Sequence, residues 1–196
     1  MSLRSLLRDV RACAACEGAL PLGARPALQL ARSARLLIIS QAPGRKVHET
    51  GIPWNDASGD RLRDWIGLDR ATFYDPARVA ILPMGFCYPG SEKTGGDKPP
   101  RPECPPLWHA RLLGHLPDVR LTLLVGQYAQ RHYLGARWNG SMTETVRAFP
   151  AYGPRFLPLP HPSWRSVVWM RRHRWFEETV IPHLRRVVRP VLASSE

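Results

Sequence analysis

Residues 35–44 read RLLIISQAPG, a short apolar run that ends in a Pro-Gly pair. An apolar run of this length in front of a turn signal is typical of a strand that is buried on both faces of a sheet. Similar runs lie at residues 78–86 and 121–127, and residues 156–160 form a fourth run in which two prolines favour an edge position. The sequence therefore predicts a sheet of four strands.

Helical patterns separate the predicted strands. The apolar residues of positions 3–10 recur at the spacing of an amphipathic helix, and Ser58 is placed to cap a helix that Gly67 ends. Further helices are predicted from Pro105 to Leu116, up to Gly135 after the third strand, and from Trp175 to Val187 with a kink at Pro182. The alternation indicates an α/β fold, a three-layer sandwich with a central four-stranded, mainly parallel sheet flanked by helices. Its length suits a single domain over residues 1–196, on which residues 1–34 pack.

A parallel sheet brings the residues that follow its strands to one edge, where ligands bind. Gln41 to Gly44 follow the first strand, Cys87 follows the second, and His161 to Ser163 follow the fourth. Residues 88–103, rich in Gly, Pro and charge, are predicted to form a loop beside them. These segments are the candidates for a functional site.

The chain is strongly basic, with 28 Lys and Arg against 16 Asp and Glu and a net charge of +12. Lys46, Lys93 and Lys98 are the only lysines, and arginine is the better residue for paired contacts to phosphate. The charge indicates a polyanionic partner, with nucleic acid ahead of a membrane surface; an arginine-rich genome without such a partner is the alternative.

No apolar stretch approaches the ~20 residues that span a bilayer, and arginines interrupt the N-terminus where a signal peptide would be apolar. We expect a cytoplasmic protein.

The chain contains four cysteines, Cys13, Cys16, Cys87 and Cys104. A cytosolic protein should not hold structural disulfides, so another reason for them is needed. Four thiolates on distant segments suit a [4Fe–4S] cluster or a tetrahedral zinc ion, with plain reduced thiols as the third possibility.

Two stretches carry a family resemblance. SQAPGRKVHETGIPWNDASGDRL (residues 40–62) resembles the GEAPG…GRPF…G motif of the four-cysteine, iron–sulfur branch of the uracil-DNA glycosylase superfamily. HPSWR (residues 161–165) resembles the HPS or HPA motif of the same superfamily, and its arginine is similar to that of the single-strand-selective branch. The resemblance extends from the first CxxC to Trp175–Glu177 and places all four cysteines on cluster ligands, which favours iron–sulfur over zinc.

The resemblance implies a monofunctional DNA glycosylase, a monomer that hydrolyses the N-glycosidic bond of uracil or another deaminated or damaged base in DNA repair. Trp54 would stack on the flipped base, and His161, as a neutral imidazole, would donate a hydrogen bond to the departing base. Arg165 would enter the space that the flipped nucleotide leaves. The residues that would surround the base are Ala42, Pro43, Gly44, Trp54, Asn55 and Pro83. The residues that would contact DNA are Ser163, Arg165, Lys93, Lys98, Arg101 and Arg171.

The sequence departs from the family pattern at three positions. Ala42 stands where many members carry Asp or Asn, and Gln41 stands where the four-cysteine branch carries glutamate. Gln41 can position a water molecule but cannot take its proton, so Glu49 is the second candidate for activating water. Pro83 stands where relatives read the uracil edge with asparagine, so either the base is not uracil or Asn55 takes over the reading.

These departures keep two other functions open. A protein that binds nucleic acid without catalysis could retain the glycosylase fold. Such a protein would not need polar side chains at the positions of Ala42 and Pro83. A metal-stabilised enzyme that acts on a small nucleoside is the third interpretation.

Overall fold

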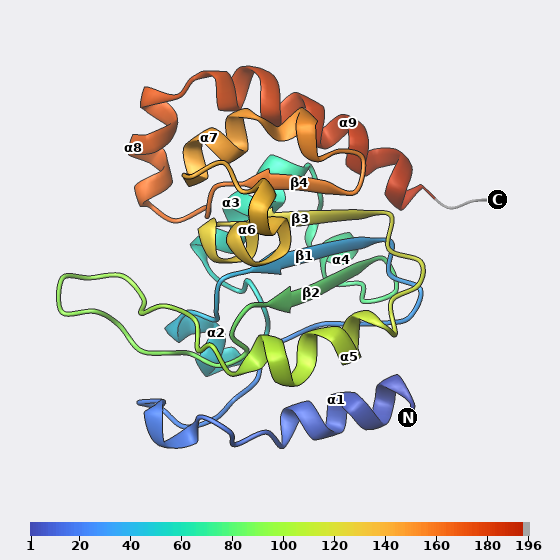
Figure 1. Ribbon diagram of the computed structural model, residues 1–196, viewed down its shortest axis with the longest axis vertical. Helices are drawn as coiled ribbons and strands as arrows, with labels where there is room; N and C mark the ends of the chain where they lie inside the picture. Colours follow the sequence, from blue (N-terminus) through green and yellow to red (C-terminus); the bar gives the residue numbers. More distant parts are fainter. Residues whose placement is uncertain (194–196) are drawn as a thin grey trace.

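The computed structural model of the protein describes residues 1–193. Its centre is a sheet of four parallel strands in the order β2-β1-β3-β4 (Figure 1). The strands are β1 (Leu36–Ser40), β2 (Val79–Pro83), β3 (Leu121–Val125) and β4 (Phe156–Leu159). Every residue of β1, β2 and β3 is buried, as continuous apolar runs predict. The two prolines of residues 156–160 lie in or just after β4, the edge strand, as predicted.

Helices cover both faces of the sheet. The α-helices are α1 (Leu3–Arg11), α2 (Arg45–Thr50), α3 (Ala57–Ile66), α4 (Arg70–Phe73), α5 (Ala110–Leu113), α6 (Gln127–Leu134), α7 (Met142–Arg147), α8 (Arg165–Arg172) and α9 (Ile181–Leu192). Leu36 and Ile38 of β1 pack with α3 and α9, whereas Leu37 and Ile39 pack with α1, α5 and α6. The three-layer sandwich is confirmed. Among the described residues, no helix is both long and apolar enough to cross a bilayer.

Local chemistry corrects several predicted boundaries. Asp56, not Ser58, caps α3: its Oδ1 accepts the backbone N–H of Gly59 at 2.8 Å. Gly67 ends this helix in the left-handed conformation, as predicted. The last helix begins with a π-helical turn at Phe176–Val180, and Pro182 is the second residue of the α-helix that follows. Because Pro182 has no N–H to donate, a widened turn at this point is its expected consequence.

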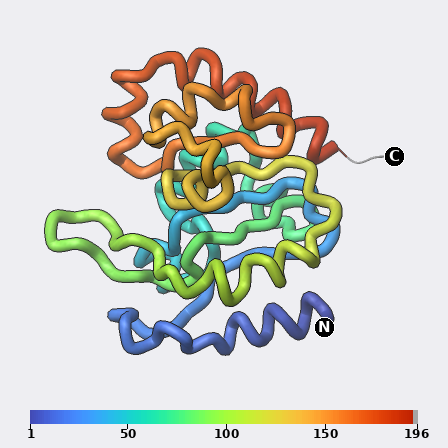
Figure 2. The backbone as a smooth tube through the Cα atoms, viewed as in Figure 1, coloured from blue at the N-terminus to red at the C-terminus, as the bar shows by residue number. Residues whose placement is uncertain are grey.

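Some short helices escaped prediction, because their sequences show too few apolar repeats. They include α2, which follows β1, and α8, which follows the HPS sequence. The segment between β2 and α5 extends outward from the carboxyl-terminal edge of the sheet (Figure 2). That edge therefore carries the first motif, the HPS segment and this long loop.

Arginines tie the ends of elements together by donating to backbone carbonyls. Arg35 and Arg78, which flank the starts of β1 and β2, donate to the carbonyls of Ala193 and Leu192 at 2.9 and 3.0 Å. Arg185 of α9 donates to the carbonyl of Asp64 in α3 at 2.7 Å. The C-terminal end of α9, whose last carbonyls lack helical partners, is thus capped by side chains from the sheet.

Candidate active site

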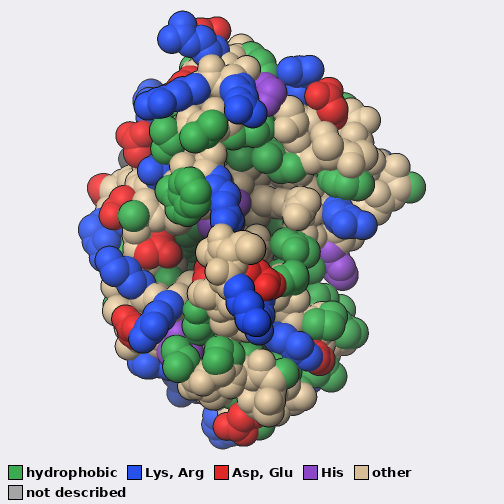
Figure 3. Space-filling view, turned by 90° about the vertical axis from the view of Figure 1, so that its left-hand side faces the viewer, with side chains coloured by type: hydrophobic (Ala, Val, Ile, Leu, Met, Phe, Trp, Pro, Cys, Tyr) green, Lys and Arg blue, Asp and Glu red, His purple; other side chains and the backbone are tan. Residues whose placement is uncertain are grey.

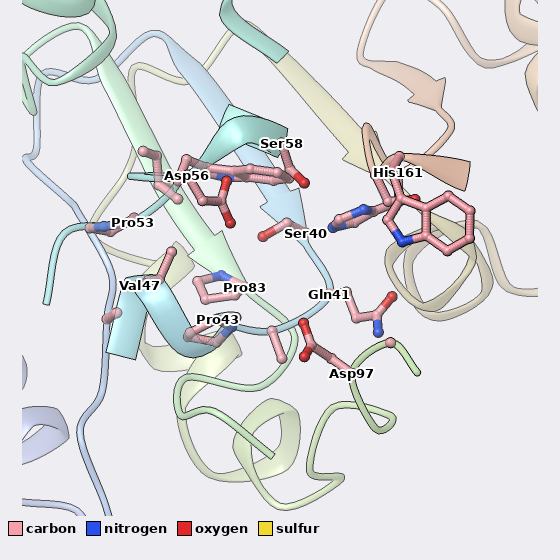
Figure 4. A pocket seen from close by; sticks show the side chains of 18 of the residues that line it. Ser40, Gln41, Pro43, Val47, Pro53, Asp56, Ser58, Pro83, Asp97 and His161 are labelled. Atoms are coloured by element: carbon pink, nitrogen blue, oxygen red, sulfur yellow. The ribbon is translucent and has the colours of Figure 1, made fainter. Parts of the chain in front are cut away.

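A cavity of about 360 Å³ opens at the carboxyl-terminal edge of the sheet (Figure 4). Its lining comes from the loop after β1, the α2–α3 segment, the end of β2, the hairpin of residues 90–98 and the HPS segment. Of the predicted site residues, the cavity brings together Gln41, Ala42, Pro43, Gly44, Trp54, Pro83, His161, Ser163 and Arg165. Two motifs about 100 residues apart thus line one pocket, as the parallel sheet predicts.

Trp54 has an unusual backbone conformation. Its φ of 59° makes it the non-glycine residue with positive φ among the described residues. Trp54 is only 7% exposed, packs on the apolar core and also lines the cavity. The buried guanidinium of Arg63 donates to the Trp54 carbonyl at 3.3 Å and to the Tyr74 hydroxyl at 3.1 Å. A backbone conformation that costs roughly 1–3 kcal/mol is held by its surroundings, as is common at binding sites.

The Trp54 indole stacks on the His161 imidazole, with ring centroids 5.5 Å apart and an interplanar angle of 29°. Burial lowers the pKa of His161 from its ordinary 6.5 to about 4, and the nearby Asp56 carboxylate opposes this shift. The imidazole is therefore neutral at pH 7. Its segment is held on two sides: Ser166 Oγ donates to the His161 carbonyl, and Arg61 donates to the Pro162 carbonyl at 2.8 Å.

A buried hydrogen-bond chain supports the floor of the cavity. The carbonyl of Pro83 lies 3.1 Å from Nε2 of His109, and Nδ1 of His109 lies 2.6 Å from the Tyr133 hydroxyl. A carbonyl only accepts, so Nε2 carries the proton and the Tyr133 hydroxyl donates to Nδ1. Burial lowers the pKa of His109 to about 4, which keeps this neutral tautomer at physiological pH.

Two carboxylates in the cavity were missed by the sequence reasoning, Asp56 and Asp97. Asp56 lies inside the first motif, and its position before a helix indicates only a helix cap, not a place in the cavity. Asp97 lies on the hairpin, and one of its carboxylate oxygens is 3.4 Å from the point that a Cβ on Gly44 would occupy. Burial and then the Asp56 carboxylate raise the pKa of Asp97, while a hydrogen bond with Ser91 opposes the shift.

The structure does not bring Glu49 or Asn55 into the cavity. The Glu49 carboxylate pairs with Arg45 on the exposed side of α2, with Nε and Oε1 3.0 Å apart. The side-chain oxygen of Asn55 accepts from Arg70 at 3.2 Å. Neither residue lines the cavity, and each side chain contacts a neighbouring arginine instead.

The HPS segment presents an exposed aromatic residue at the mouth of the cavity. Trp164 is 68% exposed, and the guanidinium of Arg165 lies 5.1 Å from its ring centroid. Arg165 also donates to the Gly95 carbonyl of the hairpin at 2.9 Å. Lys93, Lys98 and Arg171 are exposed, and Arg101 pairs with Glu103. Arginine and lysine side chains are spread over this face of the molecule, interspersed with carboxylates (Figure 3).

The four cysteines are free thiols, and the charges of the other three act on Cys104. The pKa of Cys104 is raised to about 12, chiefly by burial and to a lesser extent by the charges of Cys16, Cys87 and Cys13, while the hydrogen bond from the Phe86 N–H opposes the shift. In residues 1–193, no three His, Cys, Asp or Glu side chains converge closely enough for one metal ion. Tetrahedral zinc with Zn–S bonds of about 2.3 Å needs thiolates about 3.8 Å apart. A [4Fe–4S] cluster binds each thiolate at a different iron, so its four thiolates lie farther apart than those of a zinc site.

Two comparisons with known proteins found similarities to this chain. A model of the "Uracil DNA glycosylase superfamily" matches residues 29–185. Among solved structures, the chain is similar to the solution NMR structure of a "putative Uracil DNA glycosylase from Methanosarcina acetivorans". The TM-score is 0.42 and the sequence identity 17%, over 83% of this chain and 98% of that chain. The family match includes the whole cavity lining except Ala27, together with Cys87 and Cys104, and leaves Cys13 and Cys16 outside. On the extent of this match, the chain belongs to the uracil DNA glycosylase superfamily.

Proposed function

We propose that the protein is a monofunctional DNA glycosylase that hydrolyses the N-glycosidic bond of uracil or another deaminated or damaged base. The observation that carries the proposal is the stacked pair of Trp54 and His161 in one cavity of about 360 Å³. An enzyme that acts on a base must take it out of the helix and hold it against an aromatic face. Trp54 supplies that face, and its unusual backbone conformation is fixed before any base enters.

His161 acts on the departing base. Breaking the bond leaves negative charge on the base, and a hydrogen-bond donor aimed at that charge lowers the barrier. A neutral imidazole has one N–H to donate, and the pKa of about 4 keeps His161 neutral at physiological pH. Loss of one such donor in an oxyanion hole costs about 10²–10³ in rate, and we expect a similar contribution here.

Hydrolysis rather than a lyase step fits the residues of the cavity. A lyase needs an amine that forms a Schiff base with the sugar. Among the described residues that line the cavity there is no lysine. Gln41 would orient the attacking water, since its amide offers both a donor and an acceptor.

DNA is the proposed partner, approached by the face in Figure 3. The net charge of +12 would bring the protein to the phosphate backbone. Ser163, Arg165, Lys93, Lys98, Arg101 and Arg171 remain the proposed contacts. Trp164 joins them, because an exposed aromatic ring beside the cavity can stack on a neighbouring base.

Cys13, Cys16, Cys87 and Cys104 would hold a [4Fe–4S] cluster, with structural zinc as the alternative. When bound, the cluster would serve as a structural cross-link rather than as a reactant. Cys87 and Cys104 flank the long loop, and Cys13 and Cys16 follow α1, so four thiolate bonds would tie the N-terminal segment to that loop.

A non-catalytic DNA-binding protein is the second candidate. Ala42 and Pro83 line the cavity without a polar side chain at two positions where relatives carry one. Binding of a flipped base would need only Trp54 and the shape of the pocket.

Oligonucleotides distinguish the two candidates. Duplexes and single strands that carry one uracil, hypoxanthine, xanthine or oxidised pyrimidine are incubated with the protein and then with alkali, which cleaves abasic sites. Strand cleavage with one of these bases supports the glycosylase. His161→Ala protein purified in parallel is the control for contaminating enzymes. Tight binding without cleavage of any substrate would support the non-catalytic protein instead.

A further inference from the structure

The attacking water needs a proton acceptor that neither motif supplies in an obvious way. The amide of Gln41 cannot take a proton from water, and Ala42 has no polar side-chain atom. Among the described residues that line the cavity, only Asp56 and Asp97 carry carboxylates. The proton acceptor is therefore to be sought in this pair.

Asp56 already has a structural task. Its Oδ1 accepts the N–H of Gly59 at 2.8 Å and so caps α3. The cap fixes the carboxylate at the start of the helix, where its Oδ2 lies 3.7 Å from the point that a Cβ on Gly44 would occupy. In Figure 4 the Asp56 side chain is seen farther from Gln41 than the Asp97 side chain is. In the same view Asp97 is seen at the end of the cavity where Gln41 lies. Both Asp97 and Gln41 line the cavity.

The hairpin that carries Asp97 is closed by backbone hydrogen bonds. The N–H of Glu92 donates to the Gly96 carbonyl, and the N–H of Lys98 donates to the Gly90 carbonyl, both at 2.8 Å. Gly90, Gly95 and Gly96 have φ values of 95°, 85° and 90°, which side chains rarely adopt. Asp97 follows this turn, so its position depends on the hairpin geometry.

Arg165 fastens the hairpin to the HPS segment. It donates to the Gly95 carbonyl at 2.9 Å, and Nη1 lies only 2.5 Å from the point that a Cβ on Gly96 would occupy. A side chain at residue 96 would therefore displace the guanidinium. Through this contact the carboxylate of Asp97 and the imidazole of His161 are held on one framework, although they belong to distant segments.

We propose that Asp97 is the general base that deprotonates the attacking water, a role that rests on the proposed glycosylase function. The water oxygen forms a bond to C1′ of the target nucleotide, and the water proton moves to Asp97. The N-glycosidic bond breaks, and its electron pair leaves with the base, which His161 stabilises by a hydrogen bond. The products are an abasic sugar with a hydroxyl group at C1′, protonated Asp97 and a base anion that takes up a proton on release.

The surroundings of Asp97 suit this exchange of a proton. Asp97 as a residue is exposed to solvent, and its partial burial together with the Asp56 carboxylate raises its pKa, which makes it a stronger proton acceptor than a free aspartate. The same negative charge favours the positive charge that develops on the sugar. Ser91 hydrogen-bonds to Asp97, and the polar or charged residues that line the cavity with it are Ser40, Gln41, Asp56, Ser58, His161, Ser163 and Arg165.

The test does not require that the excised base be known. Two duplexes carry an abasic analogue, either a neutral tetrahydrofuran or a pyrrolidine whose protonated nitrogen mimics the positive sugar. The dissociation constants of both are measured for the wild type, Asp97→Asn, Asp56→Asn and Glu92→Gln. Glu92 is the matched control, a carboxylate on the same hairpin that does not line the cavity.

We expect the wild type and Glu92→Gln to bind the pyrrolidine duplex at least ~10-fold more tightly than the tetrahydrofuran duplex. Asp97→Asn should bring the two affinities to within about two-fold of each other, whereas Asp56→Asn should keep most of the preference. Unchanged preference in Asp97→Asn, or its loss only in Asp56→Asn, would overturn the assignment. If the wild type binds neither analogue better than undamaged DNA, the glycosylase function itself is refuted.

A pH profile tests the proton transfer separately. Since the pKa of Asp97 is raised, the single-turnover rate should fall as the pH is lowered through that pKa. Asp56→Asn removes one of the two causes that raise the pKa of Asp97, so the fall in rate should move to lower pH. An unchanged profile in both Asp97→Asn and Asp56→Asn would contradict the proposal.

Discussion

The carbonyl oxygen of Trp54 lies against Gly59, at a point where the Cβ of any other residue would overlap it. Glycine is a poor choice inside a helix, by about 1 kcal/mol relative to alanine. Its position in α3 is explained by this approach, which Arg63 completes by donating to the same carbonyl. The left-handed conformation of Trp54 therefore depends on two residues of α3, Gly59 and Arg63.

Gly59→Ala should therefore lower stability although alanine favours helix. The added methyl group must displace the Trp54 backbone, and we expect a loss of roughly 1–3 kcal/mol in the free energy of unfolding. Chemical denaturation measures this loss. Gly114→Ala is the matched control, since φ there is −60° and the point that a Cβ would occupy lies 3.5 Å from the Ala110 carbonyl oxygen, an ordinary contact distance. Equal stability of the two variants would refute the explanation.

His161→Ala should lower the single-turnover rate of base excision by about 100- to 1,000-fold, because one donor to the leaving base is lost. DNA affinity should change little, since the donor acts on charge that exists only in the transition state. Rates with excess enzyme and binding by fluorescence anisotropy separate the two effects. His115→Ala, away from the cavity, should match the wild type. Excision by His161→Ala at the wild-type rate would show that the site is wrong.

Stability should fall as the pH is lowered from about 6.5 towards 4. Burial lowers the pKa of both His109 and His161 to about 4, whereas an unfolded histidine takes up its proton near 6.5. In that window the unfolded chain binds more protons, so each histidine changes the free energy of unfolding by about 1.4 kcal/mol per pH unit. Denaturant titrations across the window measure the slope. His109→Gln should make it shallower, and an unchanged slope would mean that His109 titrates normally.

Protein prepared without oxygen should be brown and contain about four iron atoms per chain. Cys87→Ser should lose the metal and lower the melting temperature, because metal binding is coupled to folding. Absorption spectra and elemental analysis provide the measurement. Colourless protein with about one zinc atom per chain would replace the cluster by a zinc site.

DNA affinity should decrease steeply with salt, since contacts to phosphate release bound counterions. Arg165→Ala should weaken binding to a duplex more than to a single strand, because only a duplex leaves a gap beside the flipped nucleotide. Titrations at several salt concentrations measure both effects. Arg4→Ala removes the same charge from α1, away from the cavity, and should affect both forms little. Equal losses on both forms for Arg165→Ala would reduce Arg165 to a phosphate contact.

The sequence predicted the sheet because its strands are buried on both faces, so that Leu36 to Ile39 form an uninterrupted apolar signal. It predicted which segments meet, because strand ends of a parallel sheet share one edge. The interpretation of Glu49 neglected its spacing from Arg45, which favours an ion pair on a helix. Asp97 could not be assigned, since only the folded hairpin brings it to the cavity.

Several arginines donate hydrogen bonds to backbone carbonyls, so the high arginine content also has a structural explanation. They are Arg25, Arg35, Arg61, Arg63, Arg78, Arg137, Arg165 and Arg185. Exchange of Arg35 and Arg78 for lysine would leave the net charge at +12. The lysine ammonium is a compact, strongly hydrated group without the planar fork of donors. A charge-conserving exchange would therefore loosen the end of α9, which makes arginine a structural requirement of this chain.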